Sequence, residues 1–494
     1  MTTRSMVEAG QRAGCTPWPR YLLDARRWSA LAPSSGFSLL GLWGEPGFAH
    51  AAFLDETRME VLLASVAAEG GAIPALSPLW PGAALFERAL RDLWGIEAEG
   101  GTDPRPFLDH GRWPLLAPLS ARPPAHSPNP PLMEFLPAMG DGVHIIPVGP
   151  IHAGVIEPGH FRFHIQGEII VRLEVRLGYT HKGTLSLMQG KPPRAAARFA
   201  ARLSGDTTVA HSLAFARAAE AAFGVEAPPR ALALRAAMLE LERLHNHLND
   251  LGFIANDAAF AAIHARCGWL REGLLRAQAR AFGHRLMMDR VLPGGVAQDV
   301  AAGGIQAILT ALTAIGGGLP GLLQAYDRHA SLQDRVAGTG TMEAALVAAF
   351  APGGVVGRAA GRGFDARLLT GELPPGALIT RQGADVDARW RQRHAEALQS
   401  IEFLQALLPA LPDGELSVQL PARGGEGIAL VEGFRGECLA WMRLDGAGGI
   451  EACMLRDPSW LHWPLLEAAV IGNIVADFPL INKSINGSYS GVDL

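Results

Sequence analysis

The alternation of apolar and polar residues predicts strands in one part of the chain and long helices in another. The run FRFHIQGEIIVRLEVRLGY, residues 161–179, is rich in aromatic and β-branched residues on both sides of Gly167, which predicts a strand pair or hairpin. The run PPRALALRAAMLELERLHNHLNDLG, residues 228–252, carries leucines at helical spacing. Pro229 suits its first turn and Gly252 suits its end, so we predict a helix there.

Three regions of the chain differ in composition and in hydrophobic pattern. Residues 1–114 mix short apolar runs such as GFSLLGLW with a helical run, GAALFERALRDLWGI, and predict a small α+β domain. Residues 115–140 form a proline-rich linker, with six prolines among the seventeen residues 116–132. Residues 141–494 are dominated by Ala-, Leu- and Arg-rich helical segments, so we predict a mainly helical second domain.

One stretch, residues 300–326, contains no charged side chain and has the length of a membrane span. Its apolar residues recur at helical spacing as a stripe, formed by Ile305, Ile308, Leu309, Leu312 and Ile315. Three glycines from Gly316 and then Pro320 interrupt the run. We therefore predict one buried face of a water-exposed helix and no transmembrane segment.

Composition excludes several classes of protein. The net charge is -5 and the isoelectric point about 6.4, so the chain has no basic footprint for nucleic acid. Four cysteines occur and no two stand within four residues of each other, which fits neither a disulfide framework nor a structural zinc site. No secretory signal is visible near the N-terminus, so a reducing, cytoplasmic setting is expected.

Five phrases in a fixed order carry a family resemblance. They are GPIHAGVIEPGHFRFHIQGE (149–168), LEVRLGYTHKG (173–183), ERLHNHLNDLGFIANDAAF (242–260), GHRLMMDRVLPGGV (283–296) and PARGGEGIALVEGFRGE (421–437). Together they resemble the large subunit shared by group 4 membrane-bound nickel–iron hydrogenases and respiratory complex I. The phrases LFERALRDLWGI and DPRPFLDHGRWP similarly resemble the 30 kDa subunit of complex I.

The resemblance implies a fold and a set of partners. The fold is α+β: a small N-terminal α+β domain followed by a mainly α hydrogenase-large-subunit-like domain, a helical bundle with peripheral strands. The implied partners are a small subunit holding a 4Fe–4S cluster and membrane subunits that move ions. The chain would then lie peripherally on the cytoplasmic side of the inner membrane.

The metal ligands of the hydrogenases are missing from this sequence. In that family two C-x-x-C pairs hold nickel and iron, and the matching positions here are Ser204, Thr207, Ser488 and Gly491. Nickel in such a centre needs soft thiolates, which hydroxyls and glycine do not replace. We therefore expect no metal and no cofactor bound by this chain, and no tail to be removed after Leu494. Ser204, Thr207, His211 and Ser488 remain candidates to line a cofactor or acceptor pocket.

The resemblance suggests four catalytic candidates: Glu157, His160, Asp206 and Arg423. Glu157 matches the proton-passing glutamate of the hydrogenases, and otherwise pins its turn. His160, like His152 and His181, is a ligand or a structural histidine.

Asp206 could join a polar cluster with His211 or, like Thr207, cap the following helix, and the two roles are compatible. Arg423, matched to the arginine beside the hydrogenase iron, either binds an anion, pairs with Glu157 or Asp493, or fixes its loop. Glu242 and His245 form a single E-x-x-H copy, too few ligands for a di-iron site, and predict a buried polar network.

Two functions remain open at this point. Aligned without gaps, the residues that complex I uses beside its quinone fall at Gly205, near Ile156 and at Ser204, so neither known catalytic set is present. The first hypothesis is an oxidoreductase subunit that takes electrons from the partner's cluster to a quinone or another small acceptor. The second is a scaffold that has lost its chemistry. No dinucleotide fingerprint follows a credible strand, so any link to NADH runs through other subunits.

Overall fold

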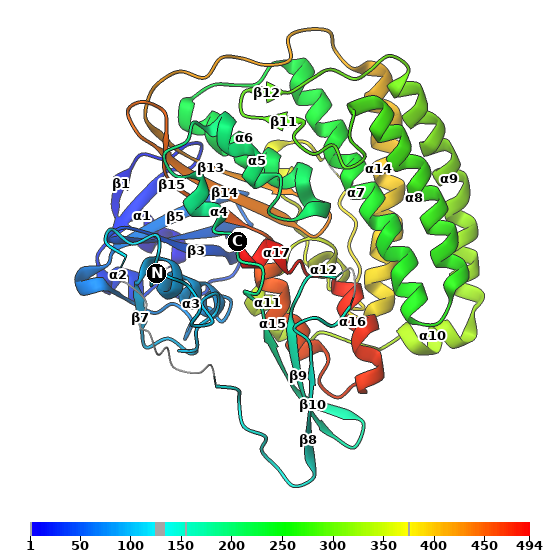
Figure 1. The fold of residues 1–494 in the computed structure, drawn as a ribbon, viewed down its shortest axis with the longest axis horizontal. Coiled ribbons are helices and arrows are strands. Elements are labelled where there is room, and N and C mark those ends of the chain that lie inside the picture. The colour runs from blue at the N-terminus through cyan, green and yellow to red at the C-terminus, as the bar shows by residue number, and fades with distance from the viewer. Residues whose placement is uncertain (1, 124–133, 154–155, 374–375) are drawn as a thin grey trace.

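The computed structural model describes residues 2–123, 134–153, 156–373 and 376–494. The fold is α+β, as the sequence predicted: an N-terminal five-stranded sheet and a central three-stranded sheet lie on one side, and long helices on the other (Figure 1). The middle of the proline-rich linker, residues 124–133, lies outside the described residues.

The N-terminal sheet has the order β1-β2-β5-β4-β3. Only the β2–β5 pair of this sheet is parallel. The helix α3 covers β3, and Gly44 of β3 lets the ring of Trp94 approach closely. The elements are α1 (Thr3–Glu8), β1 (Gln11–Ala13), β2 (Arg20–Leu23), α2 (Ala25–Ser29), β3 (Phe37–Glu45), β4 (Phe48–Asp55), β5 (Glu60–Ala67), β6 (Ala72–Pro74), α3 (Ala83–Trp94) and β7 (Glu97–Glu99).

The larger part is built around four long helices, drawn side by side at the right of Figure 1: α7 (Pro229–Asp257), α8 (Ala261–Phe282), α9 (Gly304–Arg328) and α14 (Val386–Leu407). The helix α6 (Thr208–Phe223) lies across an antiparallel sheet of β13 (Gly425–Glu432), β14 (Glu437–Leu444) and β15 (Ile450–Arg456). This sheet also meets the N-terminal part, where Arg20 binds Glu426 at 2.8 Å and Trp43 packs on Trp441. One continuous apolar core therefore joins both parts.

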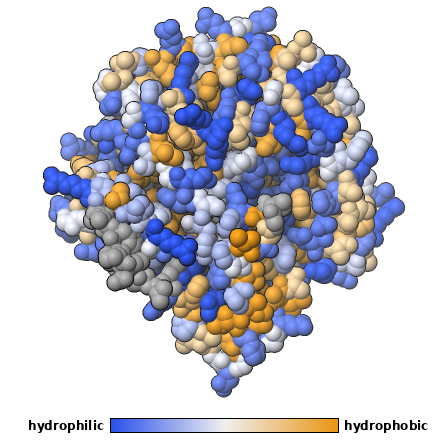
Figure 2. Space-filling model, in the orientation of Figure 1, coloured by the Kyte–Doolittle hydropathy of each residue, from blue (hydrophilic) through white to orange (hydrophobic). Residues whose placement is uncertain are grey.

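A second antiparallel sheet projects from the body at the bottom of Figure 1: β8 (Val143–Val148), β9 (His160–Gln166) and β10 (Ile169–Arg176). Its β9–β10 hairpin confirms the predicted strand pair around Gly167. Figure 2 shows apolar side chains gathered over this projection, where Ile169 and Val171 are about 40% exposed.

The shorter elements complete the chain. They are α4 (Thr184–Met188), α5 (Pro193–Ala200), β11 (Val291–Leu292), β12 (Gly295–Val296), α10 (Ala330–Val336), α11 (Ala344–Phe350), α12 (Gly354–Ala359), α13 (Arg367–Thr370), α15 (Ser459–Ala469), α16 (Phe478–Ile485) and α17 (Ser490–Asp493), with 3₁₀ turns at Glu69–Gly71, Gly205–Thr207, Leu408–Ala410 and Val475–Asp477.

Glycine does not end the helices where the sequence suggested. The helix α7 runs through Gly252 to Asp257, because a Cβ at Gly252 would stand 3.0 Å from the Cβ of Cys267 on α8, so the glycine serves close helix packing. The helix α9 likewise continues through Gly316–Gly318 and Pro320, and a Cβ at Gly318 would meet Leu270 at 3.1 Å.

Within the described residues, α9 is the one helix long and apolar enough to cross a membrane by length and composition. A single helix of this kind is weak support for a span, since packed helices pass the same test. Ile308, Leu312 and Ile315 of its apolar stripe are fully buried, and this face packs on α8 and α14.

Candidate functional site

The two segments predicted to have lost their thiolates meet in the structure. Ser204 precedes α6 and Ser488 lies between α16 and α17, yet their Oγ atoms are 2.9 Å apart. Both side chains are buried, at 3% and 4% exposure. Thr207 and Gly491 lie in the adjoining turns, Gly491 bound to Ser488 and Thr207 to Asp206. The four positions therefore converge from opposite ends of the large domain.

A carboxylate and a guanidinium occupy the centre of this group. Arg435, in the hairpin between β13 and β14, binds Asp206 through Nη1 to Oδ1 at 2.7 Å and Nη2 to Oδ2 at 2.6 Å. Ser204 and Thr207 each donate to the same Oδ1 at 2.9 Å. Burial raises the pKa of Asp206. Arg435 and the two hydroxyls together lower it by more than burial raises it, so the pKa lies well below the ordinary value. Asp206 is a fixed anion.

The hydroxyl protons have defined directions. A carboxylate only accepts, so Ser204 gives its proton to Asp206 and must accept from Ser488. Ser488 in turn accepts the backbone N–H of Gly491 at 3.0 Å. A chain of hydrogen bonds thus runs from Gly491 through two serines to Asp206.

Asp457 fills the space beside Gly491. A Cβ at Gly491 would stand 2.8 Å from Cγ and Oδ2 of Asp457. Asp457 Oδ2 binds His211 Nε2 at 2.8 Å, and Oδ1 accepts the N–H of Ser459 at 2.9 Å. Burial raises the pKa of Asp457, but His211, Arg435 and Ser459 together lower it by more, to about 2.

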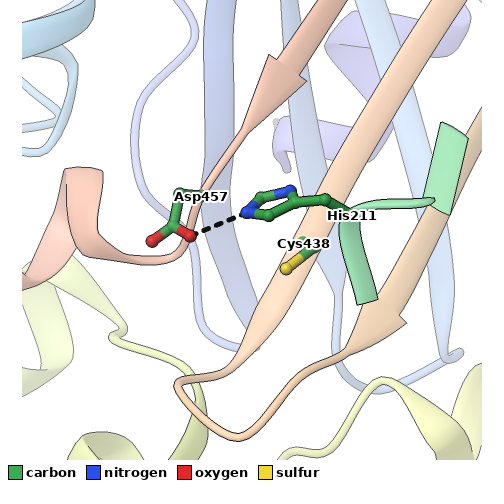
Figure 3. A group of neighbouring side chains, drawn as sticks. All are labelled: His211, Cys438 and Asp457. Carbon is green, nitrogen blue, oxygen red and sulfur yellow. Dashed lines mark hydrogen bonds and ion pairs between the residues drawn. The ribbon is translucent and has the colours of Figure 1, made fainter. Parts of the chain in front are cut away.

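His211, Cys438 and Asp457 are the candidate metal ligands among the described residues. They come from α6, β14 and the turn after β15, point toward one another (Figure 3), and their ligand atoms lie within 4.8 Å of one another. All three are buried. Burial raises the pKa of the Cys438 thiol well above its usual value, which opposes the thiolate that a metal requires. A metal would also have to break the His211–Asp457 hydrogen bond, so the arrangement favours a hydrogen-bonded pair.

The donors at the four positions do not fit a nickel–iron centre. Two serines, one threonine and one glycine provide no soft anionic ligand. The three hydroxyls already bind Asp206 or each other. The guanidinium of Arg435 supplies the positive charge at this point of the fold.

Glu157 reaches the same region from the other side. Its Oε2 accepts the N–H of Ser490, the first residue of α17, at 2.9 Å. The neighbouring His152 contacts the hydroxyl of Tyr489 at 3.1 Å. His160 does not join this group: it lies on β9, and its Nδ1 binds the carbonyl of Gly149 at 3.3 Å. Burial lowers the pKa of His160.

Arg423 lies far from these residues. It is exposed and donates to the carbonyl of Phe223 at the C-terminal end of α6, whereas Ser204 and Asp206 precede the N-terminal end. Sixteen residues of helix span about 24 Å. Of the three roles left open for Arg423, fixing its loop matches this contact.

The arginine in the site is Arg435, which sequence reasoning missed although the same phrase contains it. Gly433 and Gly436 flank it, and a charged residue in a tight glycine hairpin after an apolar strand was the available signal.

The prediction that Asp206 or Thr207 caps α6 is wrong. Neither side chain binds the free N–H groups of the first turn. Glu242 of α7 binds them instead, at Val209 (2.6 Å) and Ala210 (2.9 Å). Burial raises the pKa of Glu242 to about 8. This contact confirms the buried polar network predicted for this helix.

The fold and this group of residues resemble a large subunit of hydrogenase type, with hydroxyls and an ion pair at the positions predicted to match metal ligands. Comparison with known families agrees with that class. Residues 259–422 match the respiratory-chain NADH dehydrogenase 49 Kd subunit, residues 42–128 its 30 Kd subunit, and residues 182–251 the nickel-dependent hydrogenases.

Individual relatives point the same way. Formate hydrogenlyase subunit 5 of Escherichia coli K12 is 29% identical over 85% of this chain and 76% of its own length. An NADH-quinone oxidoreductase subunit from Dehalococcoides mccartyi strain 195 is 28% identical over 71% of this chain and 98% of its own length. A chain from the membrane-bound sulfane sulfur reductase, an archaeal respiratory membrane complex, shares the fold with a TM-score of 0.66 at 21% identity, over 72% of this chain and 99% of that one.

The chain is thus a relative of the complex I and group 4 hydrogenase large subunits, with an N-terminal part related to the 30 kDa subunit. This confirms the resemblance predicted from the sequence. It is a subunit of the complex I-like, hydrogenase-like membrane oxidoreductases, which act as assemblies.

Proposed function

We propose that this chain is the large subunit of a peripheral arm that passes electrons from a partner's 4Fe–4S cluster to a quinone or another small acceptor, without a nickel–iron centre. The arm would stand on the cytoplasmic side of the inner membrane, with ion movement in separate membrane subunits. The names of its relatives support a place in a redox assembly, since they are a subunit of formate hydrogenlyase and a subunit of an NADH-quinone oxidoreductase, and the fold is shared with a chain of a respiratory membrane complex.

The observation that carries the proposal is the ion pair between Arg435 and Asp206. It lies where the thiolate positions converge, and it neutralises charge at that point with groups that do not change oxidation state. Hydrogen splitting would need a redox metal there, whereas reduction of an organic acceptor needs only electrons from a partner and protons.

Proton delivery falls to groups around the ion pair. Reducing a quinone to a quinol takes two electrons and two protons, and the Asp206 carboxylate is held too acidic to supply them. Glu157 is half-buried and contacts Ser490, the first residue of α17. It is the candidate proton carrier. The hydroxyl chain from Ser488 to Ser204 would orient the polar groups beside it.

The proposal is tested on the purified complex. Nickel is measured by elemental analysis, and quinone reduction and hydrogen uptake are assayed on the same preparation. We expect quinone reduction with neither stoichiometric nickel nor hydrogen uptake. Either nickel at one atom per chain or hydrogen uptake would reject the proposal.

A second function, a scaffold without chemistry, is favoured by a different observation. Asp457 fills the volume beside Gly491, and the hydroxyls of Ser204, Ser488 and Thr207 all have partners. The four positions predicted to match metal ligands are therefore packed like a core. Replacing Asp206 by Asn and Arg435 by Met together separates the two functions. An assembled complex with unchanged quinone reduction would favour the scaffold.

A further inference from the structure

The helices α8 and α9 form the outer layer of the helical part, at the right of Figure 1. They run antiparallel, because a Cβ at Gly318 of α9 would meet Leu270 of α8 and one at Gly304 would meet Ala281. A groove of about 260 Å³ lies midway along the pair, and its walls are mostly apolar. The lining residues are Trp269, Leu270, Glu272, Gly273, Arg276, Ala311 and Ala314.

The outer face of α9 carries no charge. No charged side chain occurs from Gly304 to Tyr326, yet only 28% of the most apolar window of this helix is buried. A helix whose outer face meets only water normally carries charged residues there. The side chains exposed on α9 are instead small or uncharged, which lets a second helix approach closely. They are Gln306, Thr310, Thr313, Ala314, Gly317, Pro320, Gly321 and Gln324.

Trp269 stands at the wall of the groove and is 63% exposed. Among the described residues it is the one aromatic side chain among the large hydrophobic residues that are exposed. Tryptophan and arginine are the residues most enriched at the energetic centres of protein interfaces. An exposed tryptophan beside an apolar groove therefore indicates a surface that another protein covers.

Two arginines mark the opposite ends of the groove. The guanidinium of Arg266 lies 4.8 Å from the ring centroid of Trp269, and its Nη2 would be 3.9 Å from a Cβ at Gly318. The Nη2 of Arg280 would be 3.0 Å from a Cβ at Gly303, at the other end of α9.

These two arginines have no acidic partner within the described part of the chain. Arg276, which lies between them, differs because it binds Glu272 at 2.9 Å. The helix α8 carries four arginines and one glutamate, so its outer side is positively charged. Arg266 and Arg280 are about 21 Å apart along the helix axis.

We propose that this groove binds a helix of another subunit, with apolar side chains at its centre and an acidic residue at each end, about four turns apart. The apolar side chains pack on Trp269, Ala311 and Ala314, as an amphipathic helix packs into a groove. The acidic residues pair with Arg266 and Arg280, which sets the position of the helix. The proposal uses the membership of this chain in an assembly and is independent of the electron acceptor.

The first test measures whether assembly covers the groove. Ala314→Cys places a thiol in the groove, and its reaction with a maleimide is followed in the isolated full-length chain and in the purified complex. Burial raises the pKa of all four native thiols, so they react slowly. We expect the Ala314→Cys thiol to react at least tenfold more slowly in the complex. Ala25→Cys, at an exposed alanine of α2, is the matched control and should react within about twofold of its rate in the isolated chain.

The second test examines the charge of the partner. Arg266→Lys and Arg280→Lys keep the positive charge and supply an amine that a carbodiimide couples to carboxylates. In the complex we expect both lysines to be coupled to aspartate or glutamate residues of one helix of one subunit, identified by mass spectrometry. Arg58→Lys, at an exposed position between β4 and β5, is the control and should give no coupling to that helix.

Each other outcome overturns the proposal. Equal reaction of the Ala314→Cys thiol in chain and complex, or slowing by the same factor at Ala25→Cys, shows that nothing covers the groove specifically. Slowing in the isolated chain as its concentration rises shows that a second copy covers it. Slowing by phosphatidylglycerol vesicles, with none in the detergent-purified complex, shows a lipid surface. Slowing in the complex without coupling at either lysine shows a partner that is not acidic.

Discussion

Arg435 and Asp206, from segments 229 residues apart, form a two-pronged ion pair at the point where the positions matching two cysteine pairs converge. A guanidinium fork matches a carboxylate in both distance and plane. It places a positive charge among the positions predicted to match thiolates, and it ties the start of α6 to the β13–β14 hairpin. Thr207 strengthens the same connection, because Arg435 Nη1 also donates to the hydroxyl of Thr207 at 2.8 Å.

Arg435→Met leaves Asp206 with two hydroxyl donors and no cation. The Arg435 side chain is 5% exposed but that of Asp206 is 40% exposed, so water screens part of the loss. We expect the free energy of unfolding to fall by about 2 kcal/mol, below the ~3–5 kcal/mol of a fully buried pair. Chemical denaturation measures this, and adding Asp206→Asn should recover part of it.

The matched control for this variant is Arg202→Met. Arg202 binds Asp289 with the same two-pronged geometry, but both side chains are more than 40% exposed, so its loss should cost less than about 1 kcal/mol. Because the pKa of Asp206 is depressed from 3.8, the contribution of its pair to the free energy of unfolding is full above about pH 4 and declines as the pH falls below that, since the unfolded chain takes up the proton first. Equal costs for the two arginines would contradict a special role for Arg435.

Gly491→Cys tests whether Asp457 has taken the space of a ligand. The new Cβ would stand 2.8 Å from the Asp457 carboxylate, so we expect a loss of about 1–3 kcal/mol in the free energy of unfolding from overpacking. Gly205→Ala is the control, since a Cβ there meets no atom within 4 Å. Introducing Asp457→Gly should relieve most of the Gly491→Cys cost. The same cost in both backgrounds would show that the two positions do not compete for space.

Much of this arrangement was predictable from the order of the family-like phrases and from local residue patterns. Ser204 stands in a segment that matches the nickel-dependent hydrogenases, and Ser488 stands in the C-terminal phrase predicted to match the second cysteine pair. Their Oγ atoms lie 2.9 Å apart, as that prediction requires. The β9–β10 hairpin was also predictable, since its aromatic and β-branched residues on either side of Gly167 are a local signal.

Other features depend on tertiary contacts that no local pattern contains. Gly252 resembles a helix end, and only the approach of Cys267 from α8 explains why α7 passes through it. Asp206 looks like a helix cap, but Glu242, 36 positions away in the sequence, binds the free N–H groups first. Arg435 and Arg423 stand in the same phrase, and only the hairpin geometry decides which of them faces the site.

Glu242 should make stability fall as the pH rises. Its pKa is raised by burial from 4.5 to about 8, so between those values the folded state holds a proton that the unfolded state has released. The free energy of unfolding therefore decreases through this window, by at most about 1.4 kcal/mol per pH unit. Glu242→Gln removes the titration, and its difference from the unchanged chain should vary between pH 5 and 8. A constant difference across that range would show that Glu242 is ionised in the folded protein.

Glu157→Gln separates chemistry from packing at the start of α17. The amide oxygen still accepts the N–H of Ser490, which the carboxylate holds at 2.9 Å, so assembly and stability should be preserved while the carboxyl group is removed. If Glu157 carries protons, quinone reduction by the complex should fall about 100-fold, and Glu157→Asp should restore part of the rate with a shifted pH profile. Glu168→Gln, an exposed carboxyl in the β9–β10 turn, is the matched control and should leave the rate unchanged. An unaltered rate in Glu157→Gln would show that this glutamate only holds α17 in place. Another group would then have to deliver the protons for quinone reduction.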